Sequence, residues 1–281
     1  MALLRDSHMA PRRWPRVPLG RRAAWTWRHR LAATGKPVTD NERKLADCRD
    51  RHRGQRCFIL GNGPSLNRCD LTRLAGEVTF GVNSIFLGRD RMGFDPTYYV
   101  VEDPLVLEDR ADEINAYRGP HQRFFGHYAS RFVDAGPDVT WLNLRLRYDA
   151  YPGFPFFSTN ATRQVWAGGT VSYVCLQLAY HMGFDEVHLV GFDHRYQIPD
   201  SVRQEGNRLT STADDPNHFH PGYFGKGLRW HHPRVDRMEL AYRRAREAFE
   251  ADGRRVYNAT VGGALEVFER RDYASLFSAA A

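Results

Sequence analysis

The sequence predicts an α/β protein: one Rossmann-like domain with a mostly parallel, twisted sheet and helices on both faces, plus a basic N-terminal tail. Three observations predict this fold. From residue 40 onward, short strand-like runs alternate with helical segments. Several of these runs are apolar along their whole length, as strands covered on both faces must be. Two longer segments carry apolar residues at helical spacing between helix start and stop signals.

The first elements of the body surround a glycine-rich turn. A charged helix is expected over Asn41–His52, and an apolar strand over Cys57–Leu60 leads directly into the sequence GNGPSL. Further runs of strand length follow along the chain. They are Thr79–Asn83, Tyr98–Glu102, Arg123–Phe125, Val139–Leu144, Val187–Phe192 and Arg255–Asn258.

The two clearest helices lie in the second half of the chain. One is expected over Thr170–Met182, with apolar residues three and four apart and Gly183 after its end. The other is expected over Val235–Ala251, with Pro233 before it and Gly253 after it. Helices between strands in this order favour parallel pairing, because parallel strands need a long crossover.

Charge divides the 281 residues into a tail and a body. Residues 1–39 hold nine basic side chains and one acidic side chain, a net charge of +8, whereas the whole chain carries +7 and the remainder therefore −1. A near-neutral body argues against a nucleic-acid partner, because a protein face that binds the phosphates of a nucleic acid needs a broad excess of Lys and Arg. Trp14, Trp25 and Trp27 lie in this tail, and Trp with Arg suits contact with an anionic membrane surface. An unordered leader is the alternative. Residues 40–281 are expected to form the domain.

The sequence also argues against a membrane-spanning protein and against a protein held together by disulfides or a cysteine-bound zinc ion. Apolar runs such as Val187–Val190 are far shorter than the ~20 residues that cross a bilayer, so we expect no membrane-spanning segment. The four cysteines form no CxxC pair and no zinc-ligand pattern, so we expect free thiols in a reducing, cytoplasmic setting.

The GNGPSL turn is the first candidate ligand site. It follows a strand, so it should lie at the carboxyl edge of the sheet, where open α/β folds bind ligands. Gly61 and Gly63 would let the backbone approach a ligand, while Asn62 and Ser65 offer polar groups to a nucleotide. Pro64 departs from the dinucleotide fingerprint, and the GK[ST] of a P-loop is missing. A tight strand-to-helix turn is the alternative interpretation.

Other polar residues are expected at the same edge. Gly169 and Thr170 open a helix, where exposed amides attract a phosphate, although Thr170 could serve as an N-cap only. Glu102, Asp103 and Asp193 end predicted strands and could bind a divalent cation or a ribose hydroxyl, or act as caps and turn residues. These signals share one predicted location.

A histidine-rich insertion over residues 194–233 interrupts the alternation of strands and helices. Such an insertion in a compact α/β domain is typical of a lid or an active-site loop. Its spacing lacks the geometry of zinc ligands, so no metal is expected, and histidine near a nucleotide is better suited to proton transfer. Hydrogen bonds to the loop backbone are the alternative role. The five histidines are His194, His218, His220, His231 and His232, of which His231 is expected to open the second helix.

Six blocks between about residues 41 and 277 resemble a known family. They are CFILGNGPSL, FGVNSIFL, YYVVEDP, GGTVSYVCLQLAYHMGFDEVHLVGFDH, RWHHPRVDRMELAYRRAREAFE and VYNATVGGALEVF. As an ordered set they resemble the bacterial family named after the archaeal 6-hydroxymethylpterin diphosphokinase. The same blocks are similar to those of the small bacterial sialyltransferases that use CMP-sialic acid. This second resemblance implies a glycosyltransferase domain.

The resemblance also implies roles for individual residues. The implied nucleotide-binding set is Gly61, Asn62, Gly63, Pro64, Ser65, Asn83, Asp103, Gly169, Thr170, Ser172 and Asp193. His231 corresponds to the general base that takes the proton of the acceptor hydroxyl. Tyrosines contact the leaving phosphate in the relatives, but here Leu228 stands where tyrosine is expected, so Tyr196 and Tyr223 become the candidates. His218 and His220 are further candidates in the loop.

Together these features predict an enzyme of surface-polysaccharide or glycan synthesis. It would transfer an acidic, CMP-activated sugar to a glycan or lipid-linked acceptor, with no required cofactor, in the cytoplasm and peripheral to the inner membrane through residues 1–39. The first alternative is a diphosphokinase that uses ATP and Mg²⁺, with the metal at Glu102, Asp103 and Asp193. The second is a nucleotide-binding subunit of polysaccharide assembly without catalysis.

Overall fold

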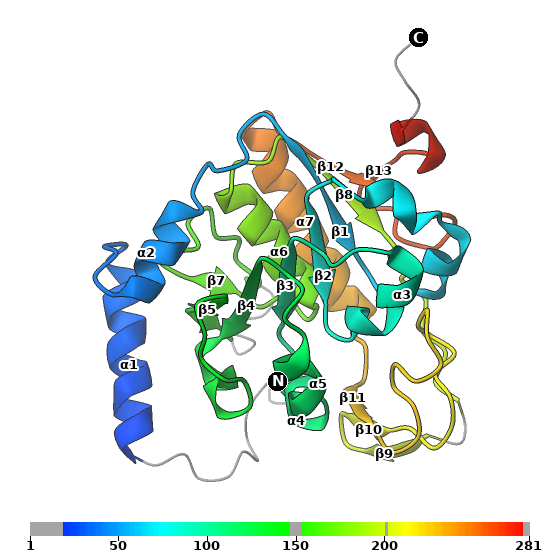
Figure 1. The fold of residues 1–281 in the computed structure, drawn as a ribbon, viewed down its shortest axis with the longest axis horizontal. Coiled ribbons are helices and arrows are strands. Elements are labelled where there is room, and N and C mark those ends of the chain that lie inside the picture. Colours follow the sequence, from blue (N-terminus) through cyan, green and yellow to red (C-terminus); the bar gives the residue numbers. More distant parts are fainter. Residues whose placement is uncertain (1–18, 147–152, 200–201, 278–281) are drawn as a thin grey trace.

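An eight-stranded parallel sheet forms the centre of the protein (Figure 1). The computed structural model describes residues 19–146, 153–199 and 202–277. In sheet order the strands are β13 (Glu269–Arg270), β12 (Arg255–Asn258), β8 (Glu186–Val190), β1 (Arg56–Leu60), β2 (Thr79–Val82), β3 (Tyr98–Val101), β4 (Gln122–Gly126) and β5 (Val139–Leu142). The parallel α/β fold predicted from the sequence is confirmed.

The strand order reverses at β1, and this reversal positions the site. Strands β2 to β5 follow on one side of β1, whereas β8, β12 and β13 lie on the other side. The chain therefore leaves the carboxyl ends of β1 and β8 in opposite directions, which opens a crevice between them where such sheets bind ligands. The two exits lie close together, since Gly61 N donates to Val190 O at 2.8 Å.

Two long helices cover one face of the sheet. Helix α6 (Val171–His181) packs on β1, β2 and β3 and lies beside α7 (Val235–Ala251). It is buried almost all round because it lies between the sheet and α7. The connections between β1, β2 and β3 run in the opposite direction along the sheet, so right-handed crossovers place them on the other face. Those connections are η2 (Pro64–Arg68), η3 (Leu71–Leu74), η4 (Ile85–Gly88) and α3 (Arg89–Met92).

The predicted helices agree with the structure to within one residue at every boundary except the end of the first. Helix α7 has the predicted limits, and α6 is one residue shorter at each end. The first body helix, α2 (Asp40–Asp47), ends before His52, which was predicted to be its last residue. The physical reason is a tertiary contact: the His52 ring lies 2.6 Å from the Tyr98 hydroxyl and stacks on Phe184, so the chain turns towards the sheet.

A helix that the sequence analysis did not predict lies in the basic segment. Helix α1 (Leu19–Ala33) contacts the body, because Arg163 Nε donates to Ala33 O at 3.2 Å and His29 contacts the Asn143 side chain. Ala32 is buried at this contact. The part of the predicted tail before Leu19 lies outside the described residues.

The histidine-rich insertion contains a small antiparallel sheet of its own. Its strands, in sheet order, are β11 (Arg229–His231), β10 (Arg208–Thr210) and β9 (Arg203–Glu205). His231 therefore ends a strand, and the prediction that it opens the following helix was wrong, because pairing of β11 with β10 holds the chain extended up to that residue. Arg229 binds the Asp109 carboxylate and so ties this sheet to the main body.

The remaining elements are short. They are α4 (Pro104–Asp109), α5 (Ala111–Ala116), η5 (His127–Arg131), η7 (Ala274–Phe277) and the parallel pair β6 (Leu144–Arg145) and β7 (Val165–Trp166). None of the helices in the described part of the chain has the length and apolar character that crossing a bilayer requires. All four cysteines are buried free thiols, as expected.

Candidate functional site

A cleft with two adjoining lobes lies at the reversal of strand order. The first lobe is lined by residues 61–63, 82–83, 170–172, 191–196, 217–218, 223 and 242. The second lobe is lined by residues 83, 102–103, 169–171, 196, 218, 224, 230–233 and 238. Both lobes share Asn83, Thr170, Val171, Tyr196 and His218. The glycine turn, the start of α6 and the insertion therefore meet in one continuous cleft.

The glycines of the GNGPSL turn allow two loops to pack closely. A Cβ atom on Gly61 would lie 2.5 Å from a backbone oxygen of the loop after β8, and one on Gly63 would lie 2.0 Å from Asp193 Oδ2. The same Asp193 oxygen accepts bonds from Ser65 Oγ at 2.5 Å and Ser65 N at 3.2 Å. These glycines were expected to let a ligand approach the backbone. In the structure they also let the loop after β8 approach it closely. The hydrogen bonds between Ser65 and Asp193 join the turn after β1 to the loop after β8.

Two asparagines that line the first lobe carry unpaired acceptors. Asn62 Nδ2 donates to Val82 O at 3.1 Å and to the Tyr223 hydroxyl at 2.9 Å, which fixes the amide in place. Its Oδ1 is buried, and so is Oδ1 of Asn83; neither has a hydrogen-bond partner in the described part of the chain. Buried acceptors without partners are costly, so each suits a donor supplied by a ligand, such as an amino group or a hydroxyl.

A chain of hydroxyl groups lines the start of α6. Thr170 Oγ1 lies 2.7 Å from Ser172 Oγ, which in turn lies 2.8 Å from the Tyr242 hydroxyl. The Thr170 side chain therefore does not cap the helix. Burial raises the pKa of Tyr242, so its phenol stays protonated and able to donate.

The second lobe contains a histidine–aspartate pair. His231 Nδ1 lies 3.0 Å from Asp103 Oδ2. Asp103 follows β3 and caps α4 by accepting a bond from Leu105 N at 2.8 Å, so its carboxylate is held by the main sheet and a helix. A carboxylate on one ring nitrogen orients the imidazole and favours the tautomer that carries its proton on that nitrogen.

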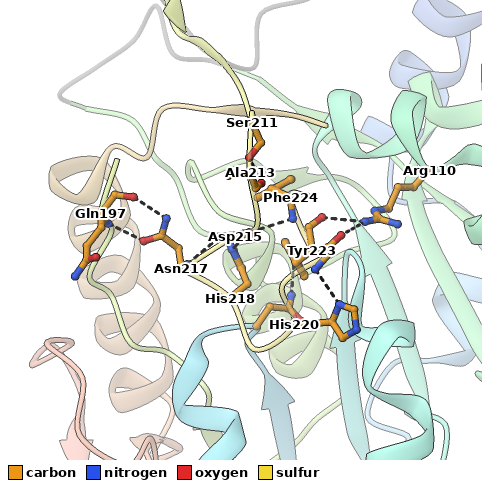
Figure 2. A network of polar contacts seen from close by, with 12 residues as sticks. Arg110, Gln197, Ser211, Ala213, Asp215, Asn217, His218, His220, Tyr223 and Phe224 are labelled. Carbon is orange, nitrogen blue, oxygen red and sulfur yellow. Dashed lines mark hydrogen bonds and ion pairs between the residues drawn. The ribbon is translucent and has the colours of Figure 1, made fainter. Parts of the chain in front are cut away.

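Figure 2 shows a second histidine–aspartate pair, whose histidine, His218, lines both lobes. His218 Nδ1 lies 2.6 Å from Asp215 Oδ2, and the His218 ring stacks on Tyr223 with the ring centres 3.9 Å apart. His220, by contrast, lines neither lobe; its Nδ1 accepts a bond from Gly222 N at 3.1 Å. It has the loop-backbone role that was the alternative for these histidines.

Most of the residues singled out in the sequence line this cleft. They are Gly61, Asn62, Gly63, Asn83, Glu102, Asp103, Gly169, Thr170, Ser172, Asp193, Tyr196, His218, Tyr223 and His231. Pro64, Ser65 and His220 do not line it. Pro64 opens η2, behind the turn.

The sequence matches one family model. Residues 36–199 match the family described as 6-hydroxymethylpterin diphosphokinase MptE-like. The chain belongs to this family. The match confirms the resemblance to the 6-hydroxymethylpterin diphosphokinase family that the sequence blocks indicated. It ends at residue 199, so the part of the insertion that contains His218 and His231 lies outside the matched segment. No curated protein sequence matches the chain.

One solved structure similar to this MptE-like protein is that of the sialyltransferase CstII from Campylobacter jejuni. It is 14% identical, with a TM-score of 0.42, and the match covers 77% of this chain and 88% of that chain.

The carboxylates of this MptE-like protein do not fit a Mg²⁺ site. Burial, and then the neighbouring Asp103, raises the pKa of Glu102 to about 8, so its carboxyl is protonated at neutral pH. Asp103 is engaged by His231, and Asp193 is engaged by Ser65. Among the described residues, no three His, Cys, Asp or Glu side chains form a group that could hold a metal ion.

Some lining residues were missed by the sequence analysis. Arg195 contributes the one arginine or lysine side chain that lines either lobe within the described residues. It directly precedes Tyr196 and so was close to a predicted position. Tyr242 lies on the apolar stripe of α7, where an aromatic residue indicates core packing, and Trp230 lies in the unpredicted β11. Local pattern carried no signal for either residue.

Proposed function

We propose that this MptE-like protein is a glycosyltransferase of surface-glycan synthesis, which moves an acidic sugar from CMP to a hydroxyl of a glycan or lipid-linked acceptor. The observation that carries the proposal is the His231–Asp103 pair in the lobe next to the unpaired amide oxygens of Asn62 and Asn83. A donor nucleoside in the first lobe would leave its sugar near a base in the second.

Donor recognition follows from the chemistry of the first lobe. The Oδ1 atoms of Asn62 and Asn83 would accept hydrogen bonds from the exocyclic amine or the ribose hydroxyls of the nucleoside. The amides and hydroxyls at the start of α6, at Thr170 and Ser172, would contact the phosphate. A single lining arginine, Arg195, matches the one phosphate of a CMP-sugar better than a triphosphate. The resemblance of the motifs to sialyltransferases favours cytidine over other nucleosides.

The transfer would proceed by direct displacement. Nε2 of His231 takes the proton of the acceptor hydroxyl as its oxygen bonds to the anomeric carbon. The bond between that carbon and the phosphate oxygen breaks, and its electron pair leaves with CMP. Asp103 holds Nδ1–H of the ring and stabilises the imidazolium that forms. In this scheme the described residues need no metal ion and no covalent intermediate.

A ligand panel tests the proposal. Ligands that bind only the native state raise the melting temperature, so CMP, CDP, UDP, GDP and ATP are compared with and without Mg²⁺. Stabilisation by CMP without Mg²⁺ supports the transferase. The family's description favours a diphosphokinase as the second candidate, and stabilisation by ATP with Mg²⁺ alone would replace our proposal with that one.

Replacement of His231 separates an enzyme from a binding subunit. His231→Ala should abolish transfer and keep the affinity for CMP, because the base lies in the second lobe. If wild-type protein binds CMP but no transfer is detected with any glycan acceptor, the chain acts as a nucleotide-binding subunit.

We further propose that the basic segment 1–39 brings the enzyme to an anionic membrane that holds a lipid-linked acceptor. Because α1 contacts the body through Arg163, the test removes only residues 1–18 and leaves α1 in place. Full-length and shortened chains are sedimented with vesicles that contain phosphatidylserine. Equal binding by both would contradict a role for the removed basic residues.

A further inference from the structure

On the basis of the proposed function, we propose that His218 is a second catalytic residue, which donates a proton to the phosphate oxygen that leaves with CMP. The first supporting observation is its position. His218 lines both lobes, so it lies at the junction between the lobe assigned to the nucleoside and the lobe that contains His231. The phosphate of a CMP-sugar connects the nucleoside to the sugar, and therefore has to cross this junction.

The second observation is the set of contacts around the His218 ring. Its one hydrogen bond within the described part of the chain joins Nδ1 to Asp215 Oδ2 at 2.6 Å. In the protonated ring, Nδ1–H is therefore held by the carboxylate, and Nε2–H is the donor left for a ligand. The side chain is 13% exposed, so it is shielded from most solvent but still borders the cleft.

The third observation is that several contacts hold this pair in place (Figure 2). Asp215 accepts bonds from Asn217 N at 2.8 Å and from Phe224 N at 3.1 Å. The His218 ring stacks on Tyr223 with 4° between the planes, and Arg110 donates to Tyr223 O at 3.0 Å. A donor held in place in this way stabilises developing charge without reorganisation during the reaction.

The fourth observation is that the hydroxyls of Tyr223 and Tyr196, of which Tyr196 also lines both lobes, are already in contact with other side chains. The Tyr223 hydroxyl lies in the wall of the cleft, where it accepts a bond from Asn62 Nδ2. Burial raises the pKa of Tyr223 well above that of an ordinary tyrosine, which makes it a weaker acid. Leu228 stands at the position where the resemblance implies tyrosine, and Tyr196 has its hydroxyl 4.0 Å from Met238 Sδ. The Nε2 atom of His218, by contrast, has no hydrogen bond within the described part of the chain.

The proposed step balances in atoms and charge. The acceptor oxygen forms a bond to the anomeric carbon and gives its proton to His231. The bond from that carbon to the phosphate oxygen breaks, and the oxygen keeps the electron pair and takes the proton from Nε2 of His218. Both imidazoles then return to their starting states by exchange of protons with solvent. No oxidant, reductant or further reactant is consumed.

The test compares CMP with cytidine, which differ by the phosphate that His218 would contact. Dissociation constants for both are measured by calorimetry on wild-type protein, His218→Ala and His218→Gln. We expect both variants to weaken CMP binding by about tenfold or more, because a charge-assisted bond is lost, and to leave cytidine binding unchanged. The matched control is His220→Ala, in the same loop but outside the cleft, which should keep the preference for CMP.

A second measurement separates the two histidines by function. Without an acceptor, slow hydrolysis of the CMP-sugar by water still requires departure of the phosphate. His218→Gln should slow this hydrolysis strongly, whereas His231→Ala should slow transfer to the acceptor far more than hydrolysis.

The outcomes distinguish this inference from the proposed function. If wild-type protein does not prefer CMP to cytidine, the proposed function fails. If it does prefer CMP and both His218 variants keep that preference and the rate of hydrolysis, only the role of His218 is overturned. A loss of preference in Tyr196→Phe, with none in His218→Gln, would assign the donor to Tyr196 instead. Should His218→Ala fail to fold, the Gln variant, which keeps a polar group of similar size, decides the question.

Discussion

Nδ1 of His231 lies 3.0 Å from Oδ2 of Asp103, although the two residues are 128 positions apart in the chain. Asp103 belongs to the segment that matches the family model, and His231 belongs to the small sheet of the insertion, beyond that segment. The contact therefore joins the two parts of the chain across the second lobe. The position of the His231 ring relative to Asp103 therefore depends on how the insertion packs against the main sheet.

Replacement of the carboxylate in this pair should separate catalysis from stability. In Asp103→Asn, the amide oxygen can still cap α4 through Leu105 N, so the fold should be retained. The ring loses its counter-charge, and we expect kcat to fall by about 10²-fold or more while the Kd for CMP stays within twofold. Steady-state kinetics and calorimetry measure the two quantities. Asp70→Asn is the control, because Asp70 caps η3 outside the cleft, and equal activity in both variants would contradict the role of Asp103.

Removal of the Asn83 side chain should weaken nucleotide binding. Asn83 has a left-handed backbone with φ of 49°, so glycine is the replacement that removes the amide without strain. We expect Asn83→Gly to raise the Kd for CMP by about tenfold, since one hydrogen bond from the ligand loses its acceptor. Asp50→Gly controls for added backbone freedom, because Asp50 has a similar φ of 53° and lines neither lobe. An unchanged Kd in Asn83→Gly would show that this acceptor does not meet the ligand.

Substitution of Gly63 should destabilise the protein even without a ligand. The added Cβ would lie 2.0 Å from Asp193 Oδ2 and 2.8 Å from a backbone oxygen, so both loops would have to shift. We expect Gly63→Ala to lower the free energy of unfolding by about 1–3 kcal/mol, as measured by urea denaturation. Gly20→Ala, in α1 with open space around it, should not lower that free energy. Full stability in Gly63→Ala would mean that the close packing of the loops is not required.

The buried carboxyl of Glu102 should make stability fall as the pH rises. Its pKa is raised to about 8 in the folded protein from an ordinary value of 4.5, so between these pH values the native state binds more protons than the unfolded state. Stability from this group is therefore complete below pH 4.5 and is lost as the pH approaches 8. Glu102→Gln should match wild type near pH 5 and exceed its free energy of unfolding by several kcal/mol at most near pH 8. Parallel stability curves for the two proteins would contradict the assignment.

Local sequence pattern was sufficient for seven of the eight strands of the main sheet and for its two long helices, but not for β13. The apolar run at Cys57–Leu60 and the stripe of α7 follow from periodicity, which depends only on neighbouring residues. Helix α1 was not predicted, because its arginines and tryptophans carry little amphipathic pattern and its contact with Arg163 is distant in the chain. The end of α2 was missed for the same reason, since His52 turns away to meet Tyr98.

By itself, then, the sequence determined where the main strands and the two long helices lie along the chain, and the edge of the sheet at which Asn62, Asn83 and Asp103 would gather, because parallel strands direct their carboxyl ends to one side. The tertiary structure alone decided which side chains pair across that edge. The contacts of His231 with Asp103 and of Gly63 with Asp193 join residues far apart in the chain, and only the packing of the insertion and the loops determines such distances.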